Sequence, residues 1–169
     1  MKMTSAQAAK LLRQFNDELN TLQLREENTK SFPASLGEDP ESVRPAYDYQ
    51  AMQDAQKAVE QKIRKVKHAI NVFNTTTVIP EFGFTIDEML VYLPQLTRRC
   101  AKLSVMKDAL PKVRENAGYG HGNAIIDYRY ANYDIVQAEK DYTELFAELS
   151  RAQTALDLIN NTVEFDIEL

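Results

Sequence analysis

The sequence has few of the residues on which several classes of protein depend. It contains one cysteine and no tryptophan, and five glycines and six prolines are few for 169 residues. A single cysteine excludes an internal disulfide and any cysteine-rich metal site. No apolar run approaches the ~20 residues that span a bilayer, and no signal-peptide pattern is seen. We therefore expect one helical domain over residues 1–169 in a reducing cytoplasm, without a membrane span.

An excess of basic charge is also missing. The net charge is -5, and acidic and basic residues alternate along the predicted helices. This alternation is typical of solvated helix faces and not of a nucleic-acid-binding surface. The densest basic run, residues 62–67, is interleaved with apolar positions of one helix, so we interpret it as a charged outer face. No nucleic-acid partner is expected.

Apolar residues recur at alternating spacings of three and four in four long segments, which is the heptad pattern of helices that pack along one stripe. The four stripes are Ala8, Leu12, Phe15, Leu19 and Leu22; Met52, Ala55, Val59, Ile63, Val66, Ile70 and Phe73; Ile86, Met89, Leu93, Leu96, Cys100, Leu103 and Leu110; and Ile135, Ala138, Tyr142, Leu145, Leu149, Ala152, Leu156 and Ile159. The fold class predicted is mainly α, with antiparallel helical hairpins or a coiled-coil-like bundle.

Helix ends are marked by capping residues and prolines. Thr4 and Thr85 each precede an amide or carboxylate three residues later, the pattern of a capping box. Pro45 is suited to the first position of the second helix, which we expect from about residue 46 to Phe73. Pro94 should kink the third helix, and Pro111 should stop it soon afterwards.

Two kinds of segment interrupt the helices. Residues 28–44 are acidic and rich in proline and serine, which predicts a mobile loop. Short β segments are predicted near residues 76–84, 125–131 and 162–169. In the last of these, alternation places four apolar residues on one side of an extended chain, and they form a possible assembly tail: Val163, Phe165, Ile167 and Leu169. We expect the tail to pair with the connector after the second helix or with the 125–130 strand, in the same chain or a neighbour.

Three features together resemble a known group. They are the end of the second helix at residues 69–75, the Gly-Phe-Thr-Ile-x-Glu sequence that begins at Gly83 and opens the third helix, and the end of the last helix at residues 153–161. In these features the chain resembles the septicolysin-like family of small, largely uncharacterised bacterial helical proteins. The resemblance implies paired long helices with small β additions, and it supplies no catalytic residues.

Candidate sites are few. His68 and Cys100 lack neighbouring ligands at helical spacing, so we interpret them as a surface residue and a core residue. Residues 118–122 are rich in glycine but lack the lysine and hydroxyl of a phosphate-binding loop, which favours a hinge or a hairpin turn. A tyrosine-rich segment nearby is a possible interaction surface, and the alternative is that its tyrosines only cover helix ends. This surface comprises His121, Tyr128, Tyr130 and Tyr133.

Two hypotheses for the function follow. The first is a non-enzymatic, self-associating scaffold or protein-interaction protein, whose main partner is itself and whose other protein partner is unknown. The second is a toxin-like, ligand-binding or membrane-binding module that uses residues 117–133. No catalytic or metal-ligand constellation is present, so we expect neither enzymatic activity nor a cofactor.

Overall fold

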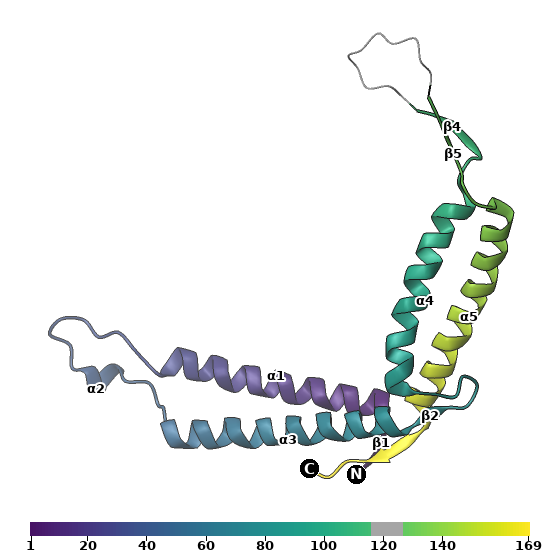
Figure 1. Cartoon of the computed structure of the whole chain (residues 1–169). Coiled ribbons are helices and arrows are strands. Elements are labelled where there is room, and N and C mark those ends of the chain that lie inside the picture. The colour runs from purple at the N-terminus through teal and green to yellow at the C-terminus, as the bar shows by residue number, and fades with distance from the viewer. Residues whose placement is uncertain (116–126) are drawn as a thin grey trace, which may run out of the picture. The chain divides into compact units, whose positions relative to one another are not determined.

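The computed structural model describes residues 1–115 and 127–169, and the chain is mainly helical, as predicted (Figure 1). It divides into two compact units, residues 1–77 with 158–169 and residues 78–157, which are described separately below. The prediction of a single domain stays a prediction.

The first unit is a helical hairpin with a small sheet. Helix α1 (Ser5–Thr29) begins with the predicted capping box, in which the Thr4 hydroxyl accepts from the backbone of Gln7. Helix α3 (Tyr49–Thr76) packs beside α1. The segment that connects α1 to α3, expected to be a loop, contains the short helix α2 (Pro40–Val43). The core of this unit contains Ala8, Val66 and Ile167.

Both ends of α3 differ from the prediction. The helix begins at Tyr49 and not at residue 46, because the Asp48 carboxylate accepts a 3.0 Å hydrogen bond from the backbone N–H of Ala51 and so caps it there. It ends at Thr76 and not at Phe73. The hydroxyls of Thr75 and Thr76 donate to carbonyls within the helix, so these residues extend the helix instead of competing with it.

The sheet of the first unit contains strands β1 (Lys2–Thr4) and β6 (Glu164–Asp166). The tail is therefore a strand, as predicted, but the predicted pairing partners are wrong. It pairs antiparallel with residues 2–4, where the sequence shows no strand signal. The Phe165 ring stacks on Phe73 with centroids 4.4 Å apart, which fixes the sheet against α3.

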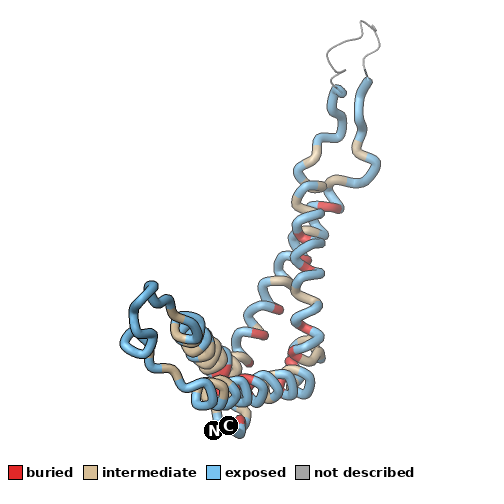
Figure 2. The backbone as a smooth tube through the Cα atoms, turned by 90° about the vertical axis from the view of Figure 1, so that its left-hand side faces the viewer, coloured by how far each residue is buried: buried red, intermediate tan, exposed pale blue. Residues whose placement is uncertain are grey.

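The second unit is a hairpin of α4 (Ile86–Lys107) and the main part of α5 (Ile135–Thr162). The two helices lie side by side and antiparallel (Figure 1). Their buried residues follow the predicted stripes, as the red positions in Figure 2 show. Leu110 is an exception. Helix α4 ends at Lys107, so Leu110 lies beyond it and is 66% exposed.

Two hairpins of strands complete the second unit. Strands β2 (Val78–Ile79) and β3 (Phe84–Thr85) pair through a turn in which Gly83 has a φ of +67°, at the position predicted for a turn. Strands β4 (Lys112–Arg114) and β5 (Tyr128–Tyr130) pair after the end of α4 and before the start of α5. We call this pair of strands the ribbon. The predicted strand near 125–131 is thus β5, and residues 125 and 126 lie outside the described residues. Among the described helices, none is long and apolar enough to cross a membrane.

Candidate interaction surfaces

The ribbon has two chemically different faces. In its register Lys112 lies opposite Tyr130 and Arg114 lies opposite Tyr128. Directly opposed residues share one face of an antiparallel pair, so two cations and two tyrosines lie together. The ammonium of Lys112 is 4.0 Å from the ring centroid of Tyr128 and 5.4 Å from that of Tyr130. Both distances are within the range of cation–π attraction.

The other face of the ribbon is close to neutral. It carries Val113 and Arg129, and its continuation carries Glu115 and Asp127. The guanidinium of Arg129 forms an ion pair with Glu115. The cation–tyrosine face therefore differs from both its reverse side and the chain as a whole, whose net charge is negative.

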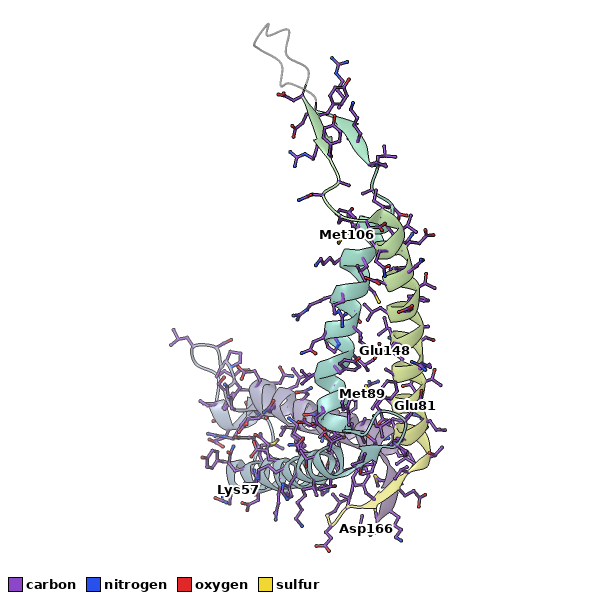
Figure 3. All side chains as sticks on the ribbon, turned by 45° about the vertical axis from the view of Figure 1, so that its right-hand side comes forward. Lys57, Glu81, Met89, Met106, Glu148 and Asp166 are labelled. Atoms are coloured by element: carbon purple, nitrogen blue, oxygen red, sulfur yellow. The ribbon has the colours of Figure 1, made fainter. Side chains whose placement is uncertain are left out.

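The predicted tyrosine surface is only partly brought together. Tyr128 and Tyr130 share the ribbon face described above and are 43% and 61% exposed. Tyr133 lies after the ribbon, and its hydroxyl donates a 2.8 Å hydrogen bond to the carbonyl of Met106, near the end of α4 (Figure 3). Its hydroxyl therefore has a partner within the chain, and the two interpretations of the tyrosine surface stay predictions. His121 lies outside the described residues.

The predicted assembly tail is split between core and surface. Ile167 is 1% exposed and Phe165 is half-buried, whereas Val163 and Leu169 are 38% and 46% exposed. Two backbone hydrogen bonds hold the tail against the start of the chain. The ammonium of Met1 donates to the carbonyl of Ile167, and the N–H of Ile167 donates to the carbonyl of Met1, each at 2.8 Å.

A groove of about 520 Å³ lies between α3 and β6 in the first unit. Its apolar floor includes Val72, Phe73 and Phe165, and its rim carries both signs of charge. His68, expected at the surface, is exposed and lies on this rim. The full lining is Lys65, His68, Ala69, Val72, Phe73, Thr76, Phe165, Asp166 and Glu168.

The two hairpins differ in their outer faces. On α5, the side opposite the buried stripe carries mostly small or apolar residues around one lysine, Lys140, over a distance of about 27 Å. On α4, the corresponding side mixes apolar or small residues with the charged residues Asp87, Arg98 and Lys102. Sequence reasoning missed this pattern because it followed only the inner stripes. The exposed residues are Val136, Lys140, Thr143, Ala147, Ser150 and Thr154 on α5, and Asp87, Val91, Pro94, Arg98, Ala101, Lys102 and Val105 on α4.

On α3, in contrast, the side opposite the buried stripe is polar and mostly charged, with Lys57, Gln61, Arg64 and His68 exposed. This is the solvated face expected from the basic run. A charged outer face is normal for a helix that borders water, whereas a helix with uncharged residues on opposite sides is typical of one that packs on both.

Polar side chains tie the helices of each hairpin together. In the first unit, the Glu26 carboxylate accepts hydrogen bonds from Tyr47, Gln53 and Gln56 at 2.7–2.8 Å. The bond from Gln56, followed by that from Tyr47, lowers the pKa of Glu26. These contacts join the end of α1 to the start of α3.

In the second unit, the Tyr92 hydroxyl donates to Glu148, which Figure 3 labels on α5. This bond, with a smaller effect of burial, raises the pKa of Tyr92. Beside it lies a polar groove of about 440 Å³ that combines basic residues of α4 with acidic residues of α5. The charged residues are Arg99 and Lys102 on α4 and Asp141, Glu144 and Glu148 on α5.

The remaining residues considered from the sequence have structural positions. Cys100 is 7% exposed in the stripe of α4, as predicted for a core residue. Within residues 1–115 and 127–169, no group of three or more His, Cys, Asp or Glu side chains is placed to hold a metal ion.

Comparisons with known proteins add the fold and no function. No family model matches the chain, and no curated protein matches it. Among solved structures, the chain is similar to the crystal structure of a functionally unknown conserved protein from Corynebacterium diphtheriae. The TM-score is 0.60 at 16% sequence identity, and the match covers 98% of this chain and 100% of the other.

Proposed function

We propose that the chain is a non-enzymatic protein that associates with copies of itself and works as a scaffold or protein-interaction module. The observation that carries this proposal is the outer face of α5, where mostly small or apolar exposed residues surround Lys140, supported by the exposed valines of α4. Val136 and Val105 are 61% and 75% exposed on these faces. Burying such residues gains about 25 cal/mol for each Å² of apolar surface removed from water.

The contrast with α3 makes the proposal specific to the second hairpin. Both hairpins have one buried stripe, but on the far side the described residues of α5 are mostly uncharged and those of α4 include two exposed valines, whereas those of α3 are mostly polar or charged. Small side chains such as Ala101, Ala147 and Ser150 allow another helix to approach closely. A second copy that presents the same faces would cover them symmetrically, as in most homo-oligomers.

A charge placed on the outer stripe tests the proposal. Ala147→Glu should shift the protein toward monomers in sedimentation velocity, because an interface would have to bury an unpaired carboxylate. The matched control is Ala58→Glu, which adds the same charge at an exposed position of α3. Circular dichroism should show that both variants keep the parental helix content. A parent chain that stays monomeric across a wide concentration range would contradict self-association.

A second candidate function rests on the ribbon. Its cation–tyrosine face has the composition that favours anionic ligands or anionic membrane surfaces. Co-sedimentation with vesicles of anionic lipid tests this candidate, with Lys112→Glu and Arg114→Glu introduced together as the comparison. The parent should pellet with anionic but not with neutral vesicles, and the variant should pellet with neither. The septicolysin-like resemblance stays a prediction beside both candidates.

A further inference from the structure

We propose that two copies of this chain join through their β-strands, with the free edge of β4 in one copy added to the free edge of β6 in the other. This inference rests on the proposed self-association and names a contact that the helix faces do not supply. It would produce an antiparallel sheet of four strands in the order β1–β6–β4–β5, the last two from the second copy.

The hydrogen bonds show which backbone groups are free on β6. Met1 and Ile167 exchange two hydrogen bonds, so they form a hydrogen-bonded pair of the antiparallel ladder. Such pairs alternate along a strand, and Glu164 and Asp166 are therefore the residues whose N–H and C=O groups point away from β1. Among the described residues this sheet has two strands, so that edge is unpaired.

The same reasoning applies to β4. Glu115 donates to the carbonyl of Asp127, and Ala131 donates to that of Pro111, so these two positions form hydrogen-bonded pairs. Lys112 and Arg114 lie at the positions between, and their backbone groups point away from β5. Proline interrupts a strand edge where its missing N–H is needed. The nitrogen of Pro111 lies on the β5 side, so the free edge loses no donor to it.

The two free edges match in register and in charge. An antiparallel pairing that places Arg114 opposite Glu164 also places Lys112 opposite Asp166. All four residues lie at positions whose backbone groups point away from their own partner strand, so the N–H and C=O groups of the two edges meet. Each cation then faces a carboxylate directly, which stabilises a cross-strand pair. The order cation, apolar residue, cation in β4 thus complements the order carboxylate, apolar residue, carboxylate in β6.

The alternate side chains also match. In this register Val113 lies opposite Phe165, on the side of the sheet that faces α3. It would enter the groove beside β6, whose floor includes Val72 and Phe73. Val113 is 45% exposed and Val72 is 46% exposed, so both have apolar surface to bury. The edge hydrogen bonds would supply affinity and the alternating side chains specificity, as in other cases of strand addition.

Charge also excludes the symmetric alternatives. Pairing β6 with β6 of a second copy would set carboxylates against carboxylates, and pairing β4 with β4 would set cations against cations. Like charges directly opposite one another destabilise a sheet. The contact is therefore heterologous, with one surface of one copy meeting a different surface of the next. Contacts of this kind build chains or rings of copies and do not stop at a dimer unless the ring closes.

Reversing the charges on each edge provides the test. Variant one carries Lys112→Glu and Arg114→Glu, and variant two carries Glu164→Lys and Asp166→Lys. Each variant alone sets like charges against each other, so its association should weaken by about tenfold in sedimentation velocity. When the two variants are mixed, each edge meets one of opposite charge, and association should return to near the parental level.

Matched controls keep the same change in net charge away from the strands. Lys57→Glu with Arg64→Glu on α3, and Asp17→Lys with Glu18→Lys on α1, change exposed residues. Both should associate like the parent. Weakening by these controls equal to that of variants one and two, or no recovery on mixing, would overturn the strand contact. A monomeric parent would overturn the proposed function itself, so the two failures are distinguishable.

Disulfide trapping tests the register. In a Cys100→Ala background, Arg114→Cys and Glu164→Cys are made in separate chains. A hydrogen-bonded pair has Cα atoms about 5.5 Å apart, within the range for a disulfide. Oxidation should give a covalent dimer in the mixture and none with either chain alone. Equal cross-linking of the Glu164→Cys chain with itself would show a symmetric contact and overturn the proposal.

Discussion

Truncating Ile167 to alanine should destabilise the first unit strongly, because this side chain is 1% exposed in the core with Ala8 and Val66. The change removes three carbon atoms, worth about 2.4 kcal/mol at about 0.8 kcal/mol each. The cavity that remains adds to this, and buried isoleucine-to-alanine changes cost about 2–5 kcal/mol. Leu169→Ala is the control. It removes a side chain of similar size from the same tail, but Leu169 is 46% exposed.

Thermal unfolding followed by circular dichroism measures both the loss of stability and the size of the cooperative unit. A loss of about 3 kcal/mol lowers the Tm by about 12–24 °C in a unit of 60–100 residues, but by only about 6–12 °C in one of 150–250 residues. The first unit has fewer than 100 residues. A large shift confined to part of the transition would indicate separate unfolding, and a smaller shift of a single transition would support one domain. Equal melting of Ile167→Ala and the parent would refute the packing of the tail.

Two further predictions concern single side chains. Glu26→Gln should lower the Tm near neutral pH, because the amide replaces a carboxylate that accepts three hydrogen bonds. The folded-state pKa of Glu26 lies below its ordinary value of 4.5, so its stabilisation is present above that value and is lost as the pH falls through the lowered pKa. Melts of parent and variant should therefore converge in acid, and a difference that persists there would contradict this origin. Pro94→Ala should raise the Tm, since Pro94 is exposed inside α4 and an interior proline costs about 3 kcal/mol relative to alanine; a lower Tm would show that the proline shapes the hairpin.

The helices could be predicted because their signals are local. Heptad spacing identified the buried stripes, and the hydroxyls of Thr4 and Thr85 located two helix starts through contacts over three residues. The start of α3 was misplaced because two local signals compete there. Pro45 is suited to a first turn, but the carboxylate of Asp48 caps the helix three residues later.

The strand partners could not be predicted because they are distant in sequence. The alternation of the tail predicted a strand, but its partner begins at Lys2 and has only three residues. The same holds for β4, which begins at Lys112, shortly after α4 ends at Lys107, and is too short to give a periodic signal. Strands of this length are stable only when packed on something else, here the stacking of Phe165 on Phe73 for β6.

The acidic residues of β6 have two effects that depend on what approaches the edge. Charged side chains on an exposed edge usually protect a sheet from pairing with copies of itself. Glu164 and Asp166 provide that protection against another β6, because four carboxylates would meet. The same charges attract an edge that carries Lys112 and Arg114 in matching register. Protection against the symmetric contact and selection of the heterologous one thus follow from the same two carboxylates. Reversing the charges of one edge should make a copy associate with a copy whose other edge is reversed, while leaving each fold intact.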